Sequence, residues 1–538
     1  MMRQYWWAIL LAAVMALPVL AILALALRGG VGTWPHLFTS VLPGLLITTV
    51  LFCGLCGALA LVFGTLSAWL ISFYDFPGRR ILSWMALLPL ALPGYIISFV
   101  YVDALTFSGP VQTALRQWMG WTSPQDYWFP EIRSLPGAAI VLSFALYPYV
   151  YLSARAAFLR LPANQIYVSR TLGRTAFRAL VEVALPQART ALFIGTVLVV
   201  IECLNDIGAA TFFGVRTLTI AVYSTWLDLG DLAGAAQLAL LLVAALGVLL
   251  YVEQHARARQ AITAQNGGQS VREPLTGVTS FLAVAAVAVP VILGFVLPCL
   301  LLVKYSLRRF EETFDSANLS AFASSVFLAA MACVLTLAVA LVLHYANRRH
   351  GSALLSFTMR LASLGYALPG AVLGIGLLVP LGQFDLWVNA LTTTLFSWKP
   401  GLLLSGGMIT LVFAYVVRFL IISLSNVGDG MAKIPLNLDH VSRTLGRTPF
   451  RTFVEIQLPL LKPAMIASCL LVMVDAMKEL PATLILRPFD FETLATRVFS
   501  LASLGQYESA AIPALAIAVA GLIPVIVLSR SFRTADEA

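Results

Sequence analysis

The stretch Ser169–Pro186 reads SRTLGRTAFRALVEVALP, and the stretch Ser442–Pro459 reads SRTLGRTPFRTFVEIQLP. Thirteen of the eighteen positions are identical, and the two copies are 273 residues apart. A polar, arginine-rich segment that occurs twice in a largely apolar chain indicates an internal repeat. The two copies therefore mark equivalent positions in two halves of the chain.

The composition predicts an all-α protein that spans a membrane many times. Only 11% of the 538 residues are charged and 60% are hydrophobic, whereas soluble domains average about 25% charged residues. The net charge of +9 does not predict nucleic-acid binding, because the Arg and Lys residues lie in short clusters between apolar runs, as in cytoplasmic loops. The six cysteines fall inside apolar runs without partners at zinc-like spacing, so we expect core or lipid-facing residues and assign no metal site.

Apolar runs long enough to cross a bilayer occur in two series of six, which predicts about twelve transmembrane helices in two parallel six-helix repeats. Residues 1–253 form the first repeat and 278–538 the second, and the polar stretch 254–277 is a cytoplasmic linker. The first run resembles a signal peptide, but it is long enough to span and has a counterpart in the second half, so we interpret it as a retained helix. The runs are 6–28, 43–73, 81–104, 136–158, 188–213 and 231–252, then 279–303, 321–346, 353–381, 400–424, 461–486 and 508–529.

The distribution of Arg and Lys predicts cytoplasmic N- and C-termini. Arg79-Arg80, Arg348-Arg349 and the linker arginines then lie in the cytoplasm, whereas Arg308-Arg309 would lie outside, against the rule. Each half has an even number of spans, so both copies of the repeated segment face the cytoplasm. Secondary transporters built from inverted repeats would place them on opposite sides.

The repeated segment lies between the fourth and fifth spans of each half, within 161–186 and 434–459. Its apolar residues have helical spacing, Gly173 and Gly446 interrupt them, and a Leu-Pro pair ends the run. We therefore expect a helix, a glycine turn and a second helix at the cytoplasmic face. An interfacial amphipathic helix whose arginines contact anionic lipid is the alternative. Lipid attraction does not require so many identical positions, whereas a protein partner that binds twice does.

The glycine, nine further residues and then Val/Ile-x-Leu-Pro resemble the EAA loop of bacterial binding-protein-dependent ABC importers. The positions that give this loop its name read Tyr167-Val168-Ser169 and His440-Val441-Ser442. The resemblance implies the type I importer permease fold and a short helix that docks on an ATPase subunit. The residues expected to couple the two subunits are Ser169, Arg170, Gly173, Arg174, Leu185 and Pro186, and Ser442, Arg443, Gly446, Arg447, Leu458 and Pro459.

No G-x-x-x-x-G-K-[ST] pattern occurs in the sequence, so we expect a transport subunit that is not an enzyme and binds no cofactor itself. The resemblance implies that ATP and Mg are bound by a partner ATPase, present in two copies on the cytoplasmic side. It also implies a periplasmic substrate-binding protein and a place in the bacterial inner membrane, in contact with membrane lipid and without nucleic acid.

Longer stretches resemble the ferric-iron permeases of this importer class: those that begin at Leu88 (LPLALPGYIISF), Glu202 (ECLNDIGAATFF) and Met477 (MKELPATLILRP). The resemblance runs through both halves and implies ferric iron as the substrate. Permeases for thiamine, phosphonates and polyamines share the fold and are the nearest alternatives. An ion-coupled secondary transporter and a membrane scaffold protein are the alternatives from other classes.

Charged residues inside the fifth span of each half are the candidates for a translocation pathway, because such charges are costly and usually functional. A spacing of four places two acids on one face of a helix, and carboxylates suit hard cations. A structural salt bridge is an equally good interpretation, because one half also carries a lysine. Pro93-Gly94 and Pro369-Gly370 in the third spans are either packing kinks or gate hinges. The pathway candidates are Glu202, Asp206, Asp475, Lys478 and Glu479.

Overall fold

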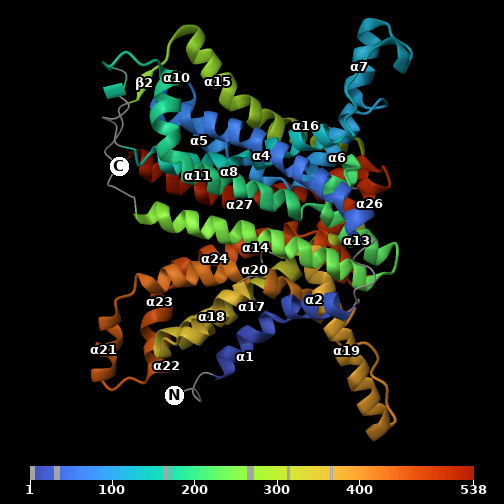
Figure 1. Cartoon of the computed structure of the whole chain (residues 1–538), viewed down its shortest axis with the longest axis vertical. Helices are drawn as coiled ribbons and strands as arrows, with labels where there is room; N and C mark the ends of the chain where they lie inside the picture. The colour runs from blue at the N-terminus through green and yellow to red at the C-terminus, as the bar shows by residue number, and fades with distance from the viewer. Residues whose placement is uncertain are drawn as a thin grey trace. The chain divides into compact units, whose positions relative to one another are not determined.

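The structure, a computed structural model, describes residues 6–28, 37–161, 168–169, 171–262, 272–311, 315–363, 365 and 368–537. Within these ranges the only strands are β1 (Tyr74–Asp75) and β2 (Glu273–Pro274), which pair in parallel, and nearly everything else is helical (Figure 1). Ten helices are long and apolar enough to cross a membrane, or up to thirteen if bent pairs are counted as single spans. The all-α, polytopic prediction is therefore confirmed.

The chain forms two compact units that differ from the two halves of its sequence. The first-repeat unit contains Trp34–Ala221, Ala244–Thr313 and Val498–Ala538. The second-repeat unit contains Met1–Thr33, Val222–Val243 and Phe314–Arg497. The boundaries of the two sequence repeats, including the linker, stay a prediction.

Each unit is built on three long helices that pack on one another. In the first-repeat unit these are α4 (Leu42–Phe73), α8 (Leu135–Phe158) and α11 (Leu185–Asn205). Their counterparts in the second-repeat unit are α17 (Ser316–His350), α20 (Met408–Ala432) and α24 (Lys462–Lys478). Gly64 shows how close the packing is, because an added Cβ would lie 2.8 Å from the backbone of α8. Small residues allow such an approach between membrane helices, where dispersion contacts replace the hydrophobic effect.

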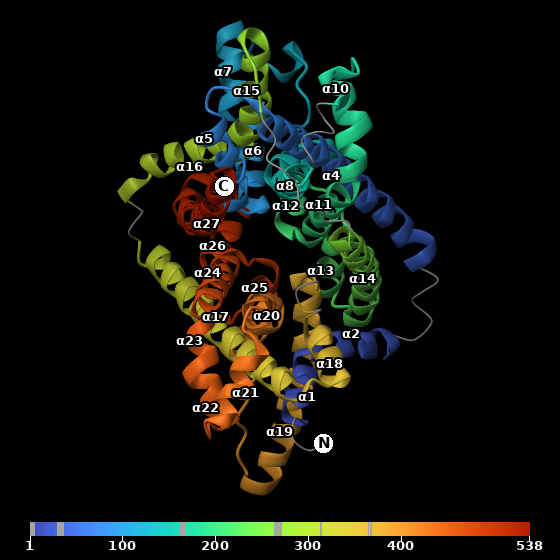
Figure 2. The ribbon, with the colours of Figure 1, turned by 90° about the vertical axis from the view of Figure 1, so that its left-hand side faces the viewer.

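The first helices of each half pack in the unit built on the other half. In the second-repeat unit α1 (Trp6–Met15) packs on α18 (Ala353–Ser363), and α2 (Leu17–Arg28) packs on α19 (Gly370–Phe396). In the first-repeat unit α15 (Gly277–Val291) packs on α4, and α16 (Leu297–Arg308) packs on α27 (Tyr507–Glu537). Figure 2 shows α1 beside α18 and α16 beside α27. The first helices of the two sequence halves are therefore exchanged between the two units.

Several predicted spans are broken rather than continuous. The run 81–104 divides into α5 (Arg79–Met85), η3 (Leu88–Ala91) and α6 (Gly94–Leu105), and the run 353–381 divides into α18 and α19. The run 188–213 divides into α11 and α12 (Ile207–Phe213), and the run 461–486 into α24 and α25 (Pro481–Leu486). The breaks in the third spans lie at the two Pro-Gly pairs, where a kink or a hinge was predicted. The breaks in the fifth spans were missed, because apolar composition indicates that a segment prefers lipid but not where its backbone turns.

The remaining elements connect or extend these helices. The stretch 105–135, between the third and fourth predicted spans, contains α7 (Pro110–Met119), so it is partly helical. Four of the six cysteines are buried, as expected for core residues, while Cys299 and Cys469 are half-buried. The other elements are η2 (Leu37–Val41), η4 (Pro124–Asp126), α10 (Ala176–Ala179), η5 (Leu180–Ala184), α13 (Leu218–Leu227), α14 (Leu232–Ile262), η6 (Ile292–Val296), α21 (Leu436–Thr444), α22 (Pro449–Thr452), η9 (Phe453–Gln457), α23 (Leu458–Leu460) and α26 (Leu494–Ser503).

Candidate functional site

The two copies of the repeated segment, hereafter the first docking segment (161–186) and the second docking segment (434–459), share a turn at their glycines. Gly173 and Gly446 have φ values of +82° and +76°, a left-handed conformation that glycine adopts without strain. In the second docking segment α21 precedes the turn and α22 follows it. The predicted helix, glycine turn and helix are therefore confirmed there, while 162–167 and Arg170 of the first segment lie outside the described residues.

The same two local interactions stabilise the turn in both copies. The hydroxyls of Thr175 and Thr448 accept hydrogen bonds from the backbone N–H three residues later, each at 3.3 Å, and so cap the helix that follows. The ion pair between Arg174 and Glu182 (3.2 Å) recurs at the equivalent positions 447 and 455 (3.4 Å). Both ion pairs are about half exposed, so they add little stability and mainly orient the two arginines.

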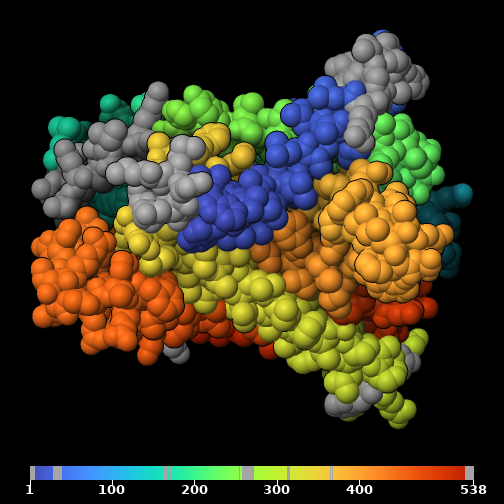
Figure 3. All heavy atoms as spheres, turned by 90° about the horizontal axis from the view of Figure 1, so that it is seen from below, coloured from blue at the N-terminus to red at the C-terminus, as the bar shows by residue number. Residues whose placement is uncertain are grey.

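Apolar side chains project from both docking segments at matching positions. Leu172 and Leu445 are each 76% exposed, and Phe177 and Phe450 are 72% and 64% exposed. The pair Val168 and Val441 is also exposed, and sequence reasoning did not single it out. In Figure 3 the second docking segment (orange, at the left) stands out at the opposite end of its unit from α19. An apolar patch that recurs in two copies marks a surface for a partner.

The two serines expected to couple subunits point into the segment instead. Ser442 is 2% exposed, and its hydroxyl lies 2.8 Å from that of Thr452, which joins α21 to α22. Ser169 is 8% exposed, and its hydroxyl has no hydrogen-bond partner among the described residues. These serines can shape the segment, but they do not present a surface to a partner.

The Leu-Pro pair ends the helix in only one of the two copies: in the second docking segment the helix ends at Leu460, directly after the pair, whereas in the first it does not end. In the first docking segment η5 continues directly into α11 at Leu185 and Pro186, so Ala176–Asn205 is one continuous helix. The π-helix η5 lies directly before Pro186, with the N–H of Leu185 bonded to the carbonyl of Leu180. The change of hydrogen-bond register at this π-bulge accommodates a proline, which has no N–H, without ending the helix. In the second docking segment the chain bends by 69° between Pro449–Leu460 and Lys462–Lys478.

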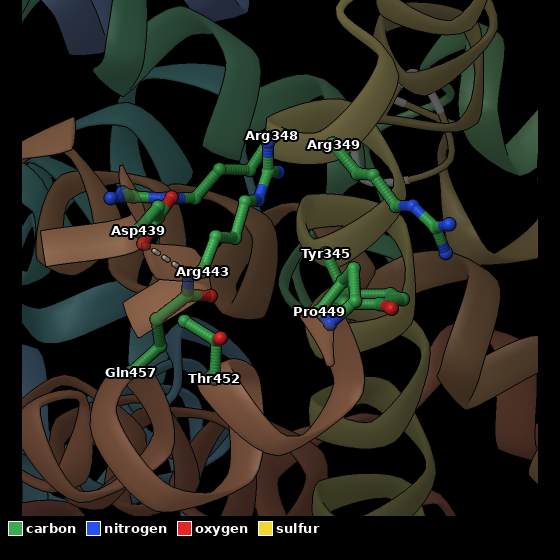
Figure 4. A pocket seen from close by; sticks show the side chains of 8 residues that line it. All are labelled: Tyr345, Arg348, Arg349, Asp439, Arg443, Pro449, Thr452 and Gln457. Atoms are coloured by element: carbon green, nitrogen blue, oxygen red, sulfur yellow. Dashed lines mark hydrogen bonds and ion pairs between the residues drawn. The ribbon is translucent and has the colours of Figure 1, made fainter. Parts of the chain in front are cut away.

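The second docking segment carries a buried ion pair that sequence reasoning missed. Asp439 on α21 lies 2.7 Å from Arg348 at the end of α17 and accepts a hydrogen bond from Gln457 at 2.8 Å. Figure 4 shows these side chains around a small polar pocket. Burial raises the pKa of Asp439, but the hydrogen bonds from Arg348 and Gln457 outweigh it, so the pKa lies below its usual value. Asp439 is therefore ionised at neutral pH.

The intramembrane acids lie at helix breaks and not on one helical face. Asp206 follows the last residue of α11 in extended conformation, and its carboxylate accepts the N–H of Ala209 at 2.8 Å. Glu479 follows α24 in the same way and accepts the N–H of Ala482 at 3.0 Å. Each acid therefore caps the short helix after the break, α12 or α25, by satisfying a free donor at its start.

The two halves differ in the residues that balance the negative charge of these acids. Glu479 lies 2.7 Å from Arg418 of α20, and the two side chains are 5% and 11% exposed. Arg418 also donates to the carbonyl of Leu368 at 3.0 Å. The first half has Ala145 in the position of Arg418. The other pathway candidates, Glu202, Asp475 and Lys478, are half-buried.

The two Pro-Gly pairs begin helices beside these acids. Pro93 and Pro369 are the N-cap residues of α6 and α19. A Cβ added to Gly94 would lie 2.3 Å from a carboxylate oxygen of Asp206. A Cβ added to Gly370 would lie 2.5 Å from the backbone nitrogen of Ala482. In each unit the break in the third span therefore meets the break in the fifth span.

This contact predicts that Gly370→Ala lowers stability more than Gly94→Ala. The first substitution clashes with backbone, which cannot move away, while the second meets a carboxylate at the end of a side chain. Overpacking of this kind costs about 1–3 kcal/mol, and thermal unfolding of the detergent-purified chain would measure it. Gly54→Ala is the matched control, because an added Cβ there has open space. An equal effect of all three substitutions would contradict the close contact.

Arg308 and Arg309, which oppose the predicted charge rule, line a cavity of about 710 Å³ in the first-repeat unit. Both pair with Glu508, at 3.0 and 3.3 Å. Its lining includes residues of α7, α16 and α27, and α7 and α16 lie at the end of this unit opposite α10 (Figure 1). The local acid offsets part of the positive charge, which explains how these arginines are tolerated on the predicted outer side.

Comparison with known proteins gives the same twofold pattern. The family model described as "Binding-protein-dependent transport system inner membrane component" matches residues 60–259 and again 337–536. The Fe(3+)-transport system permease protein FbpB 2 of Haemophilus influenzae is 27% identical over 549 residues, which cover 98% of this chain and 99% of that protein. The putative 2-aminoethylphosphonate permease PhnV of Salmonella typhimurium is 25% identical over 42% of this chain and 79% of its own length. The molybdenum permease ModB of Escherichia coli is 27% identical over 36% of this chain and 84% of its own length.

Proposed function

The chain belongs to the family of binding-protein-dependent transport system inner membrane components and is a membrane permease subunit, and we propose that it imports ferric iron. The likeness to an Fe(3+)-transport permease over nearly the whole of both chains supports this substrate. The phosphonate and molybdenum permeases match less than half of this chain. A fused two-repeat subunit is therefore shared with the iron permease in particular.

We further propose that both docking segments bind ATPase subunits, one each, which hydrolyse ATP for this chain. The single observation that carries this proposal is the pair of matching exposed apolar patches beside matching left-handed glycines. An exposed phenylalanine and leucine at equivalent positions fit two copies of one partner groove. The amphipathic lipid interpretation requires apolar exposure but no common turn geometry.

The remaining parts of the proposal follow from the family. A periplasmic binding protein delivers the substrate to the opposite side, and the chain lies in the bacterial inner membrane with both termini in the cytoplasm. The acids at the helix breaks have two roles open to them: a cation route through Glu202, Asp206, Asp475, Lys478 and Glu479, or structural capping. The buried Arg418–Glu479 pair favours capping in the second-repeat unit.

Reconstitution tests the proposal. The chain is assembled in proteoliposomes with its ATPase and binding protein, and uptake of radioactive ferric iron is followed. We expect uptake only when ATP is present on the side of the membrane that carries the ATPase and the iron-loaded binding protein is present on the other side. Uptake driven by an ion gradient without ATP would support a secondary transporter. ATP-dependent uptake of a phosphonate, thiamine, a polyamine or an oxyanion in place of iron would overturn the substrate alone.

Topology gives a separate prediction. Phe177→Cys and Phe450→Cys place thiols at exposed positions of the two docking segments without removing the capping threonines. In spheroplasts both thiols should resist a membrane-impermeant maleimide and react only after permeabilisation. A cysteine at exposed Trp118 of α7 should react at once and serves as the control. Labelling of one docking segment but not the other in intact spheroplasts would indicate inverted halves.

A further inference from the structure

We propose that Arg348 is a positioning residue that fixes the second docking segment to its membrane helices, so that the two docking segments are held differently. This inference rests on the docking role proposed above. It assigns a function to Arg348, Asp439 and Gln457, which are 91 and 18 residues apart along the chain and meet at the joint between α20 and α21.

Arg348 binds both sides of that joint. Its guanidinium donates to the carbonyls of Met431 (3.0 Å) and Ile434 (3.1 and 3.2 Å) at the end of α20, and to that of Pro435 (3.3 Å), the N-cap of α21. Its Nε donates to the carboxylate of Asp439 in the first turn of α21 at 2.7 Å. Carbonyls at a helix C-terminus lack partners within the helix and carry partial negative charge, so a planar fork with five donors suits this place.

These contacts of Arg348 with Asp439 and the three carbonyls, hereafter the clamp, are largely buried and are connected to the rest of the segment. The side chains of Arg348 and Asp439 are only 9% and 13% exposed, so the ion pair is little screened by solvent. Gln457 of η9 donates to the second oxygen of Asp439, and Tyr345 of α17 packs on Phe453 with ring centroids 5.0 Å apart. Contacts on both arms of the segment therefore connect α21 and η9 to α17 and α20. Figure 4 shows Arg348, Asp439 and Gln457 close together.

The first half has different residues in every one of these places. Gly78 and Gly351 keep the offset of 273 residues and fix the alignment. At this offset the positions of Arg348, Asp439 and Gln457 hold Asp75, Ile166 and Ala184, and those of Tyr345, Thr452 and Phe453 hold Ser72, Ala179 and Leu180. None of these side chains can form the same hydrogen bonds or the same ring contact. The turn and the apolar patch are thus duplicated, whereas the side chains that support the second docking segment are not.

The clamp predicts an asymmetric response to its removal. In Arg348→Gln, amides of α21 in the purified permease should exchange hydrogen at least about fivefold faster, a range typical of coupling between sites. Crosslinking of Phe450→Cys to the ATPase in the assembled complex should fall by a similar factor, while that of Phe177→Cys stays unchanged. Uptake per ATP hydrolysed should fall as well. Asp439→Asn keeps the size and the acceptor for Gln457, so it provides a milder second variant if Arg348→Gln assembles poorly.

Arg349→Gln is the matched control, because it removes the neighbouring arginine of α17, which is exposed and is not among the residues expected to contact the ATPase, and we expect wild-type exchange and crosslinking. Unchanged exchange in α21 of Arg348→Gln and Asp439→Asn, or an equal loss of crosslinking at both segments, would overturn the inference and leave the docking role intact. Absence of crosslinking in the chain with an unaltered clamp would overturn the docking role, and the inference with it.

Discussion

Gly173→Val combined with Gly446→Val is expected to abolish ATP-driven uptake while the permease remains in the membrane. Both glycines have positive φ values, +82° and +76°, and a left-handed conformation costs a residue with a Cβ roughly 1–2 kcal/mol, with more for a β-branched side chain. No atom lies near an added Cβ at either site, so the backbone angle alone is affected. The backbone of the turn should therefore adopt other angles, which displaces the exposed leucine and phenylalanine from the surface of the ATPase.

Each single substitution should leave part of the activity, because one docking segment remains intact. The measurement is ATP-dependent uptake in proteoliposomes at equal amounts of reconstituted permease, with co-purification of the ATPase as the second reading. Gly173→Asn with Gly446→Asn is the matched control, since asparagine tolerates the left-handed conformation better than other residues. Wild-type uptake and co-purification by the double valine variant would show that the turn does not position a docking surface.

The second large effect is expected at the buried ion pair of the second-repeat unit. Arg418→Met leaves the carboxylate of Glu479 buried and without its cation, which in soluble interiors costs roughly 3–5 kcal/mol. We therefore expect low membrane levels and a large fall in the unfolding temperature. Adding Glu479→Gln should restore part of the stability, because glutamine is neutral and its carbonyl oxygen can still cap α25.

Asp206→Asn separates a structural role from a cation route. Asparagine is a good N-cap, so α12 should remain capped and the abundance and unfolding temperature should stay near wild type. If the acids cap helix breaks, uptake per assembled complex should also stay near wild type. A strong loss of iron uptake at normal stability would instead place the Asp206 carboxylate in the translocation route.

The membrane class, the repeat and the docking turn were all predictable because they depend on local sequence. Long apolar runs indicate segments that lie in lipid, and a glycine between two short helical patterns indicates a turn. The left-handed angles at Gly173 and Gly446 confirm that the second kind of signal was sufficient. Placing Leu185 and Pro186 at a helix end was wrong, because a proline at the start of a new helical segment is tolerated.

The breaks in the fifth spans and the ion pairs of the two arginines could not be predicted from one sequence. The run 188–213 looks continuous, and the backbone turn at Asp206 depends on the contact with Gly94, which is distant in sequence. Arg348 reads as an ordinary charge near a helix end, and Arg418, which lies inside the predicted span 400–424, was not singled out. Their roles appear only when α17, α20 and α24 pack together and bring acids from other helices within ion-pair distance.

Site-specific crosslinking tests the central claim most directly, namely that both docking segments bind the same kind of ATPase subunit on the same side of the membrane. Phe177→Cys and Phe450→Cys are combined in turn with single cysteines along the surface of the ATPase facing the membrane. We predict that both positions form crosslinks to the same small set of ATPase residues, and that a cysteine at Trp118 forms none. Crosslinks from neither docking segment in a complex that is otherwise assembled and active would contradict the account.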